Sequence, residues 1–138
     1  MSELLSPDAP PSRPWSVEGF ELFWSRGRDP RMVAPVVWPD VVSKWPAAAA
    51  PVVGRAAYLG AIANFLAALG DFSVEVTDHA INGDTAFVRW IVRGDFAVGP
   101  DHIVGVDRLL LKDGYVIENH IHSDHPIFAE LAKTHALG

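Results

Sequence analysis

Asp107 is the residue of this sequence whose type and setting most strongly indicate chemistry. It alternates with Gly105 and Leu109 in a mostly apolar segment, residues 103–111. Alternate residues of a strand share one face of a sheet, so this carboxyl group should lie among apolar side chains. A carboxyl group in such a place needs a partner or a proton. Groups of this kind are typical of functional sites.

The residue opposite Asp107 on the next strand depends on the turn at Asp113-Gly114. A two-residue loop would place Asp107 opposite His120, and an Asp–His pair is an acid–base device. A three-residue loop with a left-handed glycine bulge would place it opposite Asn119. We prefer the second register, because it gives Asn119 and its apolar neighbours one face and the histidines the other.

Two interpretations of Asp107 stay open. The carboxyl group could face a ligand pocket, or it could form a buried ion pair with Arg89 or Arg108 that holds the sheet together. Arg89 could itself lie in the pocket or face solvent.

Three histidines, His120, His122 and His125, raise the question of a metal site. Metal ligands usually come from several elements and are held by supporting hydrogen bonds. Asp124 is the only carboxylate within the segment from His120 to His125. We therefore expect no metal and no organic cofactor, and assign the histidines to the surface or a subunit contact.

Composition sets wider bounds. The chain has 138 residues, 49% of them hydrophobic, which suits one domain with a substantial core. The absence of cysteine excludes disulfides and a thiol nucleophile, and a net charge of −6 argues against a nucleic-acid partner. No apolar run of about 18 residues and no signal peptide is evident, so we expect no membrane contact and a cytoplasmic protein.

The N-terminal part divides at Trp15. Residues 1–14 hold four prolines and predict a mobile arm, while residues 15–138 predict a single domain. Ser16 is a suitable helix N-cap, and Trp15 and Phe20 could pack as a hydrophobic staple. The helix should present Phe20 and Trp24 on one face and end near residue 27.

The remaining pattern predicts an α+β domain. A short helix should begin at Asp29-Pro30, followed by a strand at 40–45 and a loop at 46–51. A longer helix should run from Gly54 to Gly70, with a buried stripe at Tyr58, Ala61, Ile62, Phe65, Leu66 and Leu69. Four strands then predict an antiparallel meander over residues 72–81, 85–98, 102–111 and 115–122, and Ser123 or Asp124 should cap a last helix.

The order of these pieces resembles the nuclear transport factor 2-like superfamily, and within it the SnoaL-like polyketide cyclases. The resemblance covers residues 16–131. It rests on DVVSKWP at 40–46, GRAAY at 54–58, NGDTAFVRW at 82–90, GVDRLLLKDGYVIENH at 105–120 and SDHPIF at 123–128. It implies an α+β barrel, in which a cone-shaped curved antiparallel sheet wraps around N-terminal helices and encloses a pocket.

The resemblance also bears on the reaction. Asp107 matches the position at which ketosteroid isomerases place a protonated aspartate that stabilises a developing enolate. The base of those isomerases falls on Trp45, and their tyrosine falls near Phe20 or Glu21. Isomerase chemistry of that design is therefore disfavoured.

Related enzymes of the superfamily narrow the choice further. The catalytic aspartate of SnoaL-type cyclases falls on Ile121, with Asn119 two residues earlier. Limonene epoxide hydrolases hold water with an arginine that matches Arg89 and two aspartates that fall on Ile91 and Ile121. What remains is a site with a single carboxylate.

We expect a cofactor-independent cyclase or isomerase with a deep apolar pocket for a hydrophobic, polyketide- or terpenoid-like substrate. Asp107 would be catalytic, and Asn119 and Arg89 would orient a carbonyl or hydroxyl group. The other substrate-binding residues would be Phe20, Trp24, Trp45, Tyr58, Ile91 and Ile121. The alternative is a noncatalytic ligand-binding or dimeric assembly domain of the same fold.

A homodimer is also expected. Val88 and Trp90 should lie on the outer sheet face with His120 and His122, and apolar residues on an outward face favour a partner. The superfamily resemblance suggests the same assembly.

Overall fold

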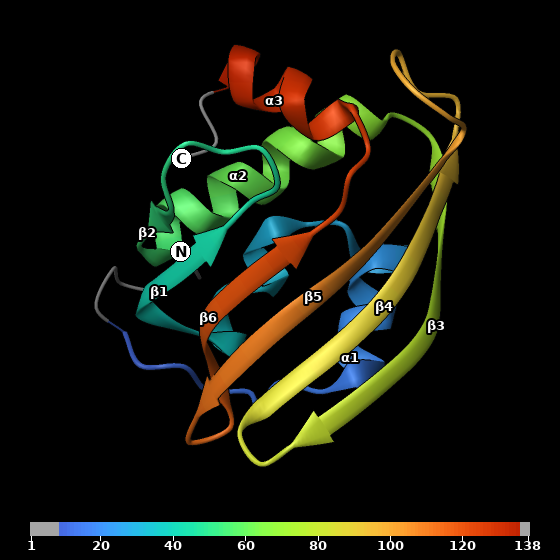
Figure 1. The fold of residues 1–138 in the computed structure, drawn as a ribbon. Helices are drawn as coiled ribbons and strands as arrows, with labels where there is room; N and C mark the ends of the chain where they lie inside the picture. Colours follow the sequence, from blue (N-terminus) through green and yellow to red (C-terminus); the bar gives the residue numbers. More distant parts are fainter. Residues whose placement is uncertain (1–8, 136–138) are drawn as a thin grey trace.

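A curved six-stranded sheet forms one side of the molecule, and the helices gather against its concave face (Figure 1). This computed structural model describes residues 9–135, with side chains to residue 133. The strands are β1 (Val37–Lys44), β2 (Val52–Val53), β3 (Phe72–Asn82), β4 (Thr85–Gly94), β5 (His102–Lys112) and β6 (Tyr115–His122). Their spatial order is β2-β1-β6-β5-β4-β3, with β2 and β3 at open edges. The α+β class and the curved sheet are confirmed, but the predicted closure into a barrel is wrong because the edge strands do not pair.

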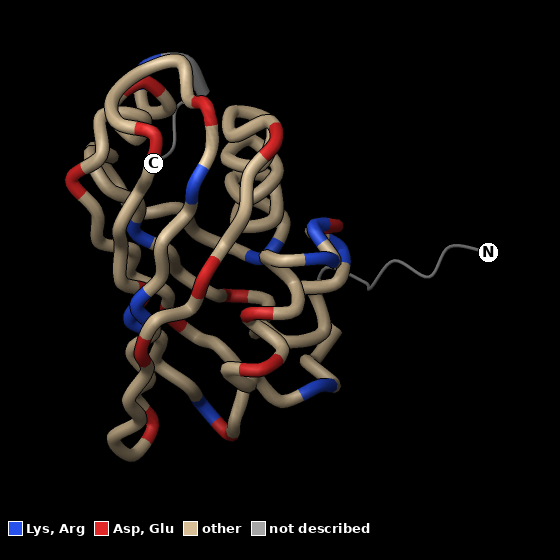
Figure 2. The backbone as a smooth tube through the Cα atoms, turned by 90° about the vertical axis from the view of Figure 1, so that its right-hand side faces the viewer, with Lys and Arg blue, Asp and Glu red and all other residues tan. Residues whose placement is uncertain are grey.

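Charged residues are distributed along the whole chain. Within the described residues, Lys and Arg lie interspersed with Asp and Glu rather than along one stripe (Figure 2). No helix in this part of the chain is long and apolar enough to cross a membrane.

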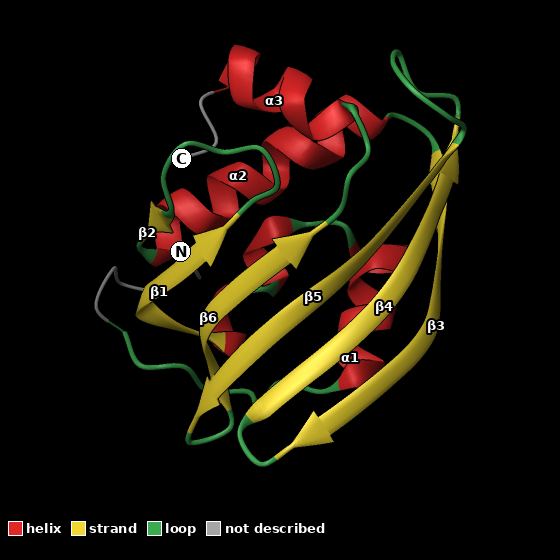
Figure 3. Cartoon of the chain, in the orientation of Figure 1, coloured by secondary structure: helices red, strands yellow, loops and turns green. Residues whose placement is uncertain are grey.

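The sheet is mostly a meander, with β3, β4, β5 and β6 paired antiparallel in chain order (Figure 3). The exception is β1, which runs parallel to β6 and also pairs with β2. The predicted strand at 85–98 ends earlier, at Gly94, whose N–H donates to the carbonyl of Asp101 at 3.0 Å. The four predicted meander strands are therefore confirmed, one of them with a shorter span.

The N-terminal helices follow their local signals. Helix α1 (Val17–Leu22) starts where the Ser16 hydroxyl accepts a hydrogen bond from the Gly19 N–H, and Trp15 packs edge-on against Phe20. The chain continues through the π-helical η1 (Phe23–Gly27) and the short 3-10 turns η2 (Pro30–Met32) and η3 (Ala34–Val36). These segments cover the concave face of the sheet.

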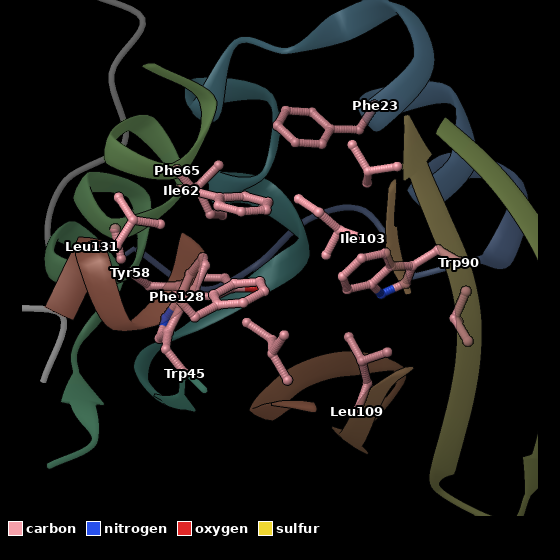
Figure 4. Close-up of a cluster of buried hydrophobic side chains, with 14 of the residues drawn as sticks. Phe23, Trp45, Tyr58, Ile62, Phe65, Trp90, Ile103, Leu109, Phe128 and Leu131 are labelled. Atoms are coloured by element: carbon pink, nitrogen blue, oxygen red, sulfur yellow. The ribbon is translucent and has the colours of Figure 1, made fainter. Parts of the chain in front are cut away.

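Two further helices complete the core. Helix α2 (Arg55–Leu69) buries the predicted stripe almost completely, with Leu66 alone partly exposed. Helix α3 (Ile127–His135) follows β6. The ring of its Phe128 stacks on the ring of Phe65 of α2, with 5.2 Å between the ring centroids. Figure 4 shows side chains of α2 facing those of Trp90 and Leu109 from the sheet.

The β5–β6 hairpin has neither of the registers considered from the sequence. Its loop has two residues, Asp113 and Gly114, both with positive φ, which is the geometry of a tight hairpin turn. A bulge on β6 between Val116 and Glu118 then adds one residue, so that Asp107 lies opposite Ile121. The second register was preferred because it places Asn119 on the interior face of its strand. That placement is found in the structure, where Asn119 is buried.

The prediction that Val88 and Trp90 lie on the outer face of the sheet is wrong. Val88 and Trp90 are buried together with Ala86 and Val92, so these residues face the core. Arg89, Ile91 and Arg93 therefore point outward. Placing Val88 and Trp90 on the outer face was wrong because apolar residues occupy both faces of this strand, which leaves its phase ambiguous.

Part of the predicted N-terminal arm lies outside the described residues, namely residues 1–8. Residues 9–14 contact the domain: Ser12 and Arg13 donate backbone hydrogen bonds to the Pro35 carbonyl, and Arg55 donates to the carbonyl of Ala9. Mobility of the arm and the domain boundary at residue 15 stay predictions.

Candidate functional site

A cavity of about 300 Å³ lies between the concave sheet face and the helices. Its walls are mostly apolar and include residues of α1, η1, α2, β4, β5 and β6. Among the predicted site residues, those that line it are Phe20, Trp24, Trp45, Tyr58, Asp107, Asn119 and Ile121. Aromatic side chains from both layers therefore surround a small group of polar atoms.

Asp107 lies on the inner face of β5, as its alternation with apolar residues predicts. It is only 4% exposed and lies between Val88 of β4 and Ile121 of β6. The Trp90 indole N–H donates to Asp107 Oδ1 at 2.9 Å. Burial raises the pKa of Asp107 to about 6, against the opposing effect of hydrogen bonds from Trp90 and Asn119.

The Trp90 ring owes its position to Gly105. These two residues are cross-strand partners, and a Cβ atom at Gly105 would overlap the six-membered ring of Trp90. The same Cβ atom would approach the carbonyl oxygen of His122 at 2.9 Å. The missing side chain therefore lets the indole lie across β5 with its N–H directed at Asp107.

Asn119 and Tyr58 form the second polar pair of the cavity. Asn119 Nδ2 donates to the Tyr58 hydroxyl oxygen at 2.7 Å, which joins β6 to α2. Burial and the neighbouring Asp107 charge raise the pKa of Tyr58, so its hydroxyl stays protonated. Asn119 Oδ1 is buried and has no hydrogen-bond partner among the described residues.

The structure does not support an ion pair at Asp107. Arg89 is exposed and its guanidinium donates to Thr77 Oγ1 at 2.9 Å, on the outer face of the sheet. Arg108 also faces outward, 4.0 Å from Glu118. The causes of the raised Asp107 pKa include no positive charge. Of the two interpretations of Asp107, the geometry favours a carboxyl group in the cavity wall.

Two residues that were predicted to bind the substrate lie outside the cavity. Arg89 and Ile91 do not line the cavity, because both lie on the outward phase of β4. Trp90, between them, does line it and was missed as a site residue. A signal was available in the sequence, since Arg89 and Arg93 share one face of β4 and charged residues favour the solvent side.

The expectation that all three histidines lie at the surface or a subunit contact is wrong for His125. His125 is buried, its Nε2 lies 2.8 Å from the Pro100 carbonyl, and its Nδ1 accepts from the Ile127 N–H at the start of α3. His120 lies on the outer face, 3.7 Å from Glu118. Within residues 9–133, whose side chains are described, no three His, Asp or Glu residues form a group that could hold a metal ion.

Comparison with known families gives one clear match. A family model described as a SnoaL-like domain matches residues 17–119, which is more than half of the chain. No curated protein matches the sequence.

Solved structures share the fold at low sequence identity. A candidate polyketide cyclase from Sinorhizobium meliloti is 24% identical, with 77% of this chain and 92% of that chain covered and a TM-score of 0.63. A candidate SnoaL-like polyketide cyclase from a Jannaschia species is 19% identical, with 96% and 94% covered and a TM-score of 0.66. A protein from Catenulispora acidiphila with a ketosteroid isomerase-like fold, in complex with trimethylamine, is 16% identical, with 77% and 82% covered and a TM-score of 0.64. At these identities the likeness shows the fold alone.

Proposed function

We propose that this chain, which belongs to the SnoaL-like domain family, is a cyclase or isomerase for a hydrophobic, polyketide- or terpenoid-like molecule. The observation that carries the proposal is the Asp107 carboxyl group, buried in the wall of a mostly apolar cavity with a pKa of about 6. A group with this pKa can both take and return a proton near neutral pH. The two candidate polyketide cyclases of the same fold agree with this reaction class.

Asp107 acts as the general base and then as the general acid. Its ionised carboxyl group takes a proton from the carbon next to a ligand carbonyl, and the electron pair of that C–H bond forms an enolate. Where a C=C bond of the ligand is conjugated with the enolate, returning the proton to the far carbon of that bond gives an isomer. Alternatively, the enolate carbon bonds to a second carbonyl carbon of the same molecule, and Asp107 protonates the alkoxide that forms.

Tyr58 and the cavity walls assist this step. Because Tyr58 accepts its hydrogen bond from Asn119, its own O–H can donate to the enolate oxygen. The aromatic residues Phe20, Trp24 and Trp45 hold the ligand folded and exclude water, so that proximity contributes to the rate. In this proposal the reaction needs no metal or organic cofactor.

A proton-exchange experiment tests the catalytic proposal without the natural substrate. Methyl β-naphthyl ketone has exchangeable hydrogens next to its carbonyl, and the protein should accelerate their replacement by deuterium in D₂O, as followed by proton NMR. Asp107→Asn should lower exchange to the rate without protein, whereas Asp40→Asn, at an exposed position on β1, should not. Equal exchange rates in Asp107→Asn and the parent would contradict the role of Asp107.

The alternative function is noncatalytic. The cavity volume lies at the lower end of the range for small-molecule pockets, about 300–1,000 Å³, which also suits a ligand-binding or dimeric assembly domain. In that case the ketone would bind, as seen by calorimetry, but its exchange would stay at the rate without protein.

We further propose a homodimer through the outer sheet face, with corrected residues. This face carries the half-buried Ile91, Val104 and Val106 beside His120 and His122, and an apolar outward face favours a partner. Val106→Glu should convert the dimer to a monomer at micromolar concentration, as measured by light scattering. Val53→Glu, at an exposed apolar position on β2, is the matched control and should leave the mass unchanged. A parent protein that is monomeric would refute this assembly.

The remaining partner assignments also stay predictions. We expect a cytoplasmic location, with neither nucleic acid nor membrane as a partner, on the basis of the net charge of −6 and the sequence pattern.

A further inference from the structure

Asn119 Oδ1 is an unusual atom for the interior of a folded protein. Asn119 lines the cavity and is 3% exposed, yet its side-chain oxygen accepts no hydrogen bond from any described residue. Buried polar atoms are nearly always paired, because an unpaired one has lost its water without replacement. An unpaired acceptor in a cavity wall therefore suggests that a bound molecule supplies the donor.

The orientation of the Asn119 amide follows from its neighbours. Nδ2 donates to the Tyr58 hydroxyl oxygen at 2.7 Å, and the amide also lowers the pKa of Asp107, as an N–H donor does. Exchanging the amide nitrogen and oxygen would turn the oxygen toward an ionised carboxyl group, which only accepts hydrogen bonds. The amide nitrogen therefore faces Tyr58 and Asp107, and the amide oxygen is the atom left for a ligand.

Among the described residues, none donates a hydrogen bond to this oxygen. Asn119 pairs with Leu109 on β5, which is apolar, and with Ser43 on β1, whose buried hydroxyl makes no hydrogen bond to Oδ1. The buried indoles of Trp45 and Trp90 already donate, to Ser43 and Asp107.

We propose that Asn119 Oδ1 accepts a hydrogen bond from a hydroxyl or enol O–H of the ligand, and so makes Asn119 a specificity-determining residue. The cavity then selects hydrophobic molecules in which an O–H group accompanies the carbonyl that meets Asp107, such as a hydroxy ketone or an enolised diketone. This inference rests on the proposed function, because it requires that the cavity bind a small molecule.

The test compares two probes that differ in one donor, β-naphthol and its methyl ether. Calorimetry on the parent protein should give a dissociation constant about tenfold lower for β-naphthol, the size expected for one hydrogen bond to a buried acceptor. Asn119→Leu should abolish this preference. Asn64→Leu, the same exchange on α2 outside the cavity wall, should retain it.

The outcomes separate this inference from the proposed function. Equal affinity of the parent for both probes, or a preference that survives Asn119→Leu, would overturn the role of Asn119 while leaving the cavity a binding site. Failure of both probes to bind would count against the proposed function as well. If Asn119→Leu does not fold, the carbon-13 resonance of the Asn119 side-chain carbonyl in the parent decides: it should shift with β-naphthol and stay unchanged with the methyl ether.

Discussion

Replacing Asp107 with asparagine should make the protein more stable at neutral pH, by about 3 kcal/mol in the free energy of unfolding. Burial raises the pKa of Asp107 from its ordinary 3.8 to about 6. The ionised form is therefore disfavoured in the folded state by about 1.4 kcal/mol for each pH unit between these two values. Asparagine keeps an oxygen for the Trp90 N–H and cannot ionise.

The raised pKa of Asp107 determines how the stability of the protein changes with pH. A pKa raised on folding means that the folded state binds more protons than the unfolded chain between about pH 4 and pH 6. The contribution of Asp107 to stability is complete below about pH 4 and is lost as the pH rises through 6. The difference in the free energy of unfolding between Asp107→Asn and the parent should thus be constant below about pH 4, increase in favour of the variant between about pH 4 and pH 6, and be constant again at higher pH.

Urea unfolding at several pH values measures this difference. Asp40→Asn is the control, since it removes an exposed carboxyl group and should show no such gain. The ion-pair interpretation predicts the opposite, a loss of about 3–5 kcal/mol at neutral pH from a stranded arginine. A variant that unfolds much more easily than the parent at neutral pH would therefore refute the cavity account of Asp107.

A methyl group at Gly105 should have a second large effect. Gly105→Ala should lower the free energy of unfolding by about 1–3 kcal/mol, because the new Cβ atom overlaps the Trp90 ring and crowds the backbone of β6. Trp90 can relieve the overlap only by moving its N–H away from Asp107. The pKa of Asp107 should then rise further.

Gly60→Ala is the matched control for this variant. A Cβ atom at Gly60 meets no atom within 4 Å, and the residue lies in the interior of α2, so alanine should stabilise the protein by about 0.5–1 kcal/mol. Thermal unfolding of both variants measures the contrast. Equal stability of Gly105→Ala and the parent would mean that Trp90 does not need the space at Gly105.

Local signals in the sequence predicted most of the fold. Ser16 caps α1 as expected, the stripe from Tyr58 to Leu69 is buried, and the period-two pattern located all four meander strands. These features depend on residues close together in the chain, where side-chain periodicity and capping act directly. The prediction of a closed barrel was wrong because closure depends on pairing between the edge strands, which no local sequence pattern encodes.

The site was predicted less completely, for two physical reasons. The bulge between Val116 and Glu118 shifts the partner of Asp107 by one residue, and neither turn geometry alone nor alternation reveals it. Strand β4 carries apolar residues on both faces, and the prediction of Trp90 outward and Arg89 inward is the reverse of the structure. Asp107 and Asn119 were placed on the interior face because their neighbours on β5 and β6 are consistently apolar.

A carbon-13 NMR titration of the Asp107 carboxyl group tests the central claim most directly. The signal is identified by its absence in Asp107→Asn, and its chemical shift is followed across the pH range in the protein without ligand. A buried acid in the cavity wall should titrate with a midpoint at about 6. A midpoint at or below the ordinary value, about 4, would contradict the account, because it would mean that the carboxyl group is solvated or held by a positive charge.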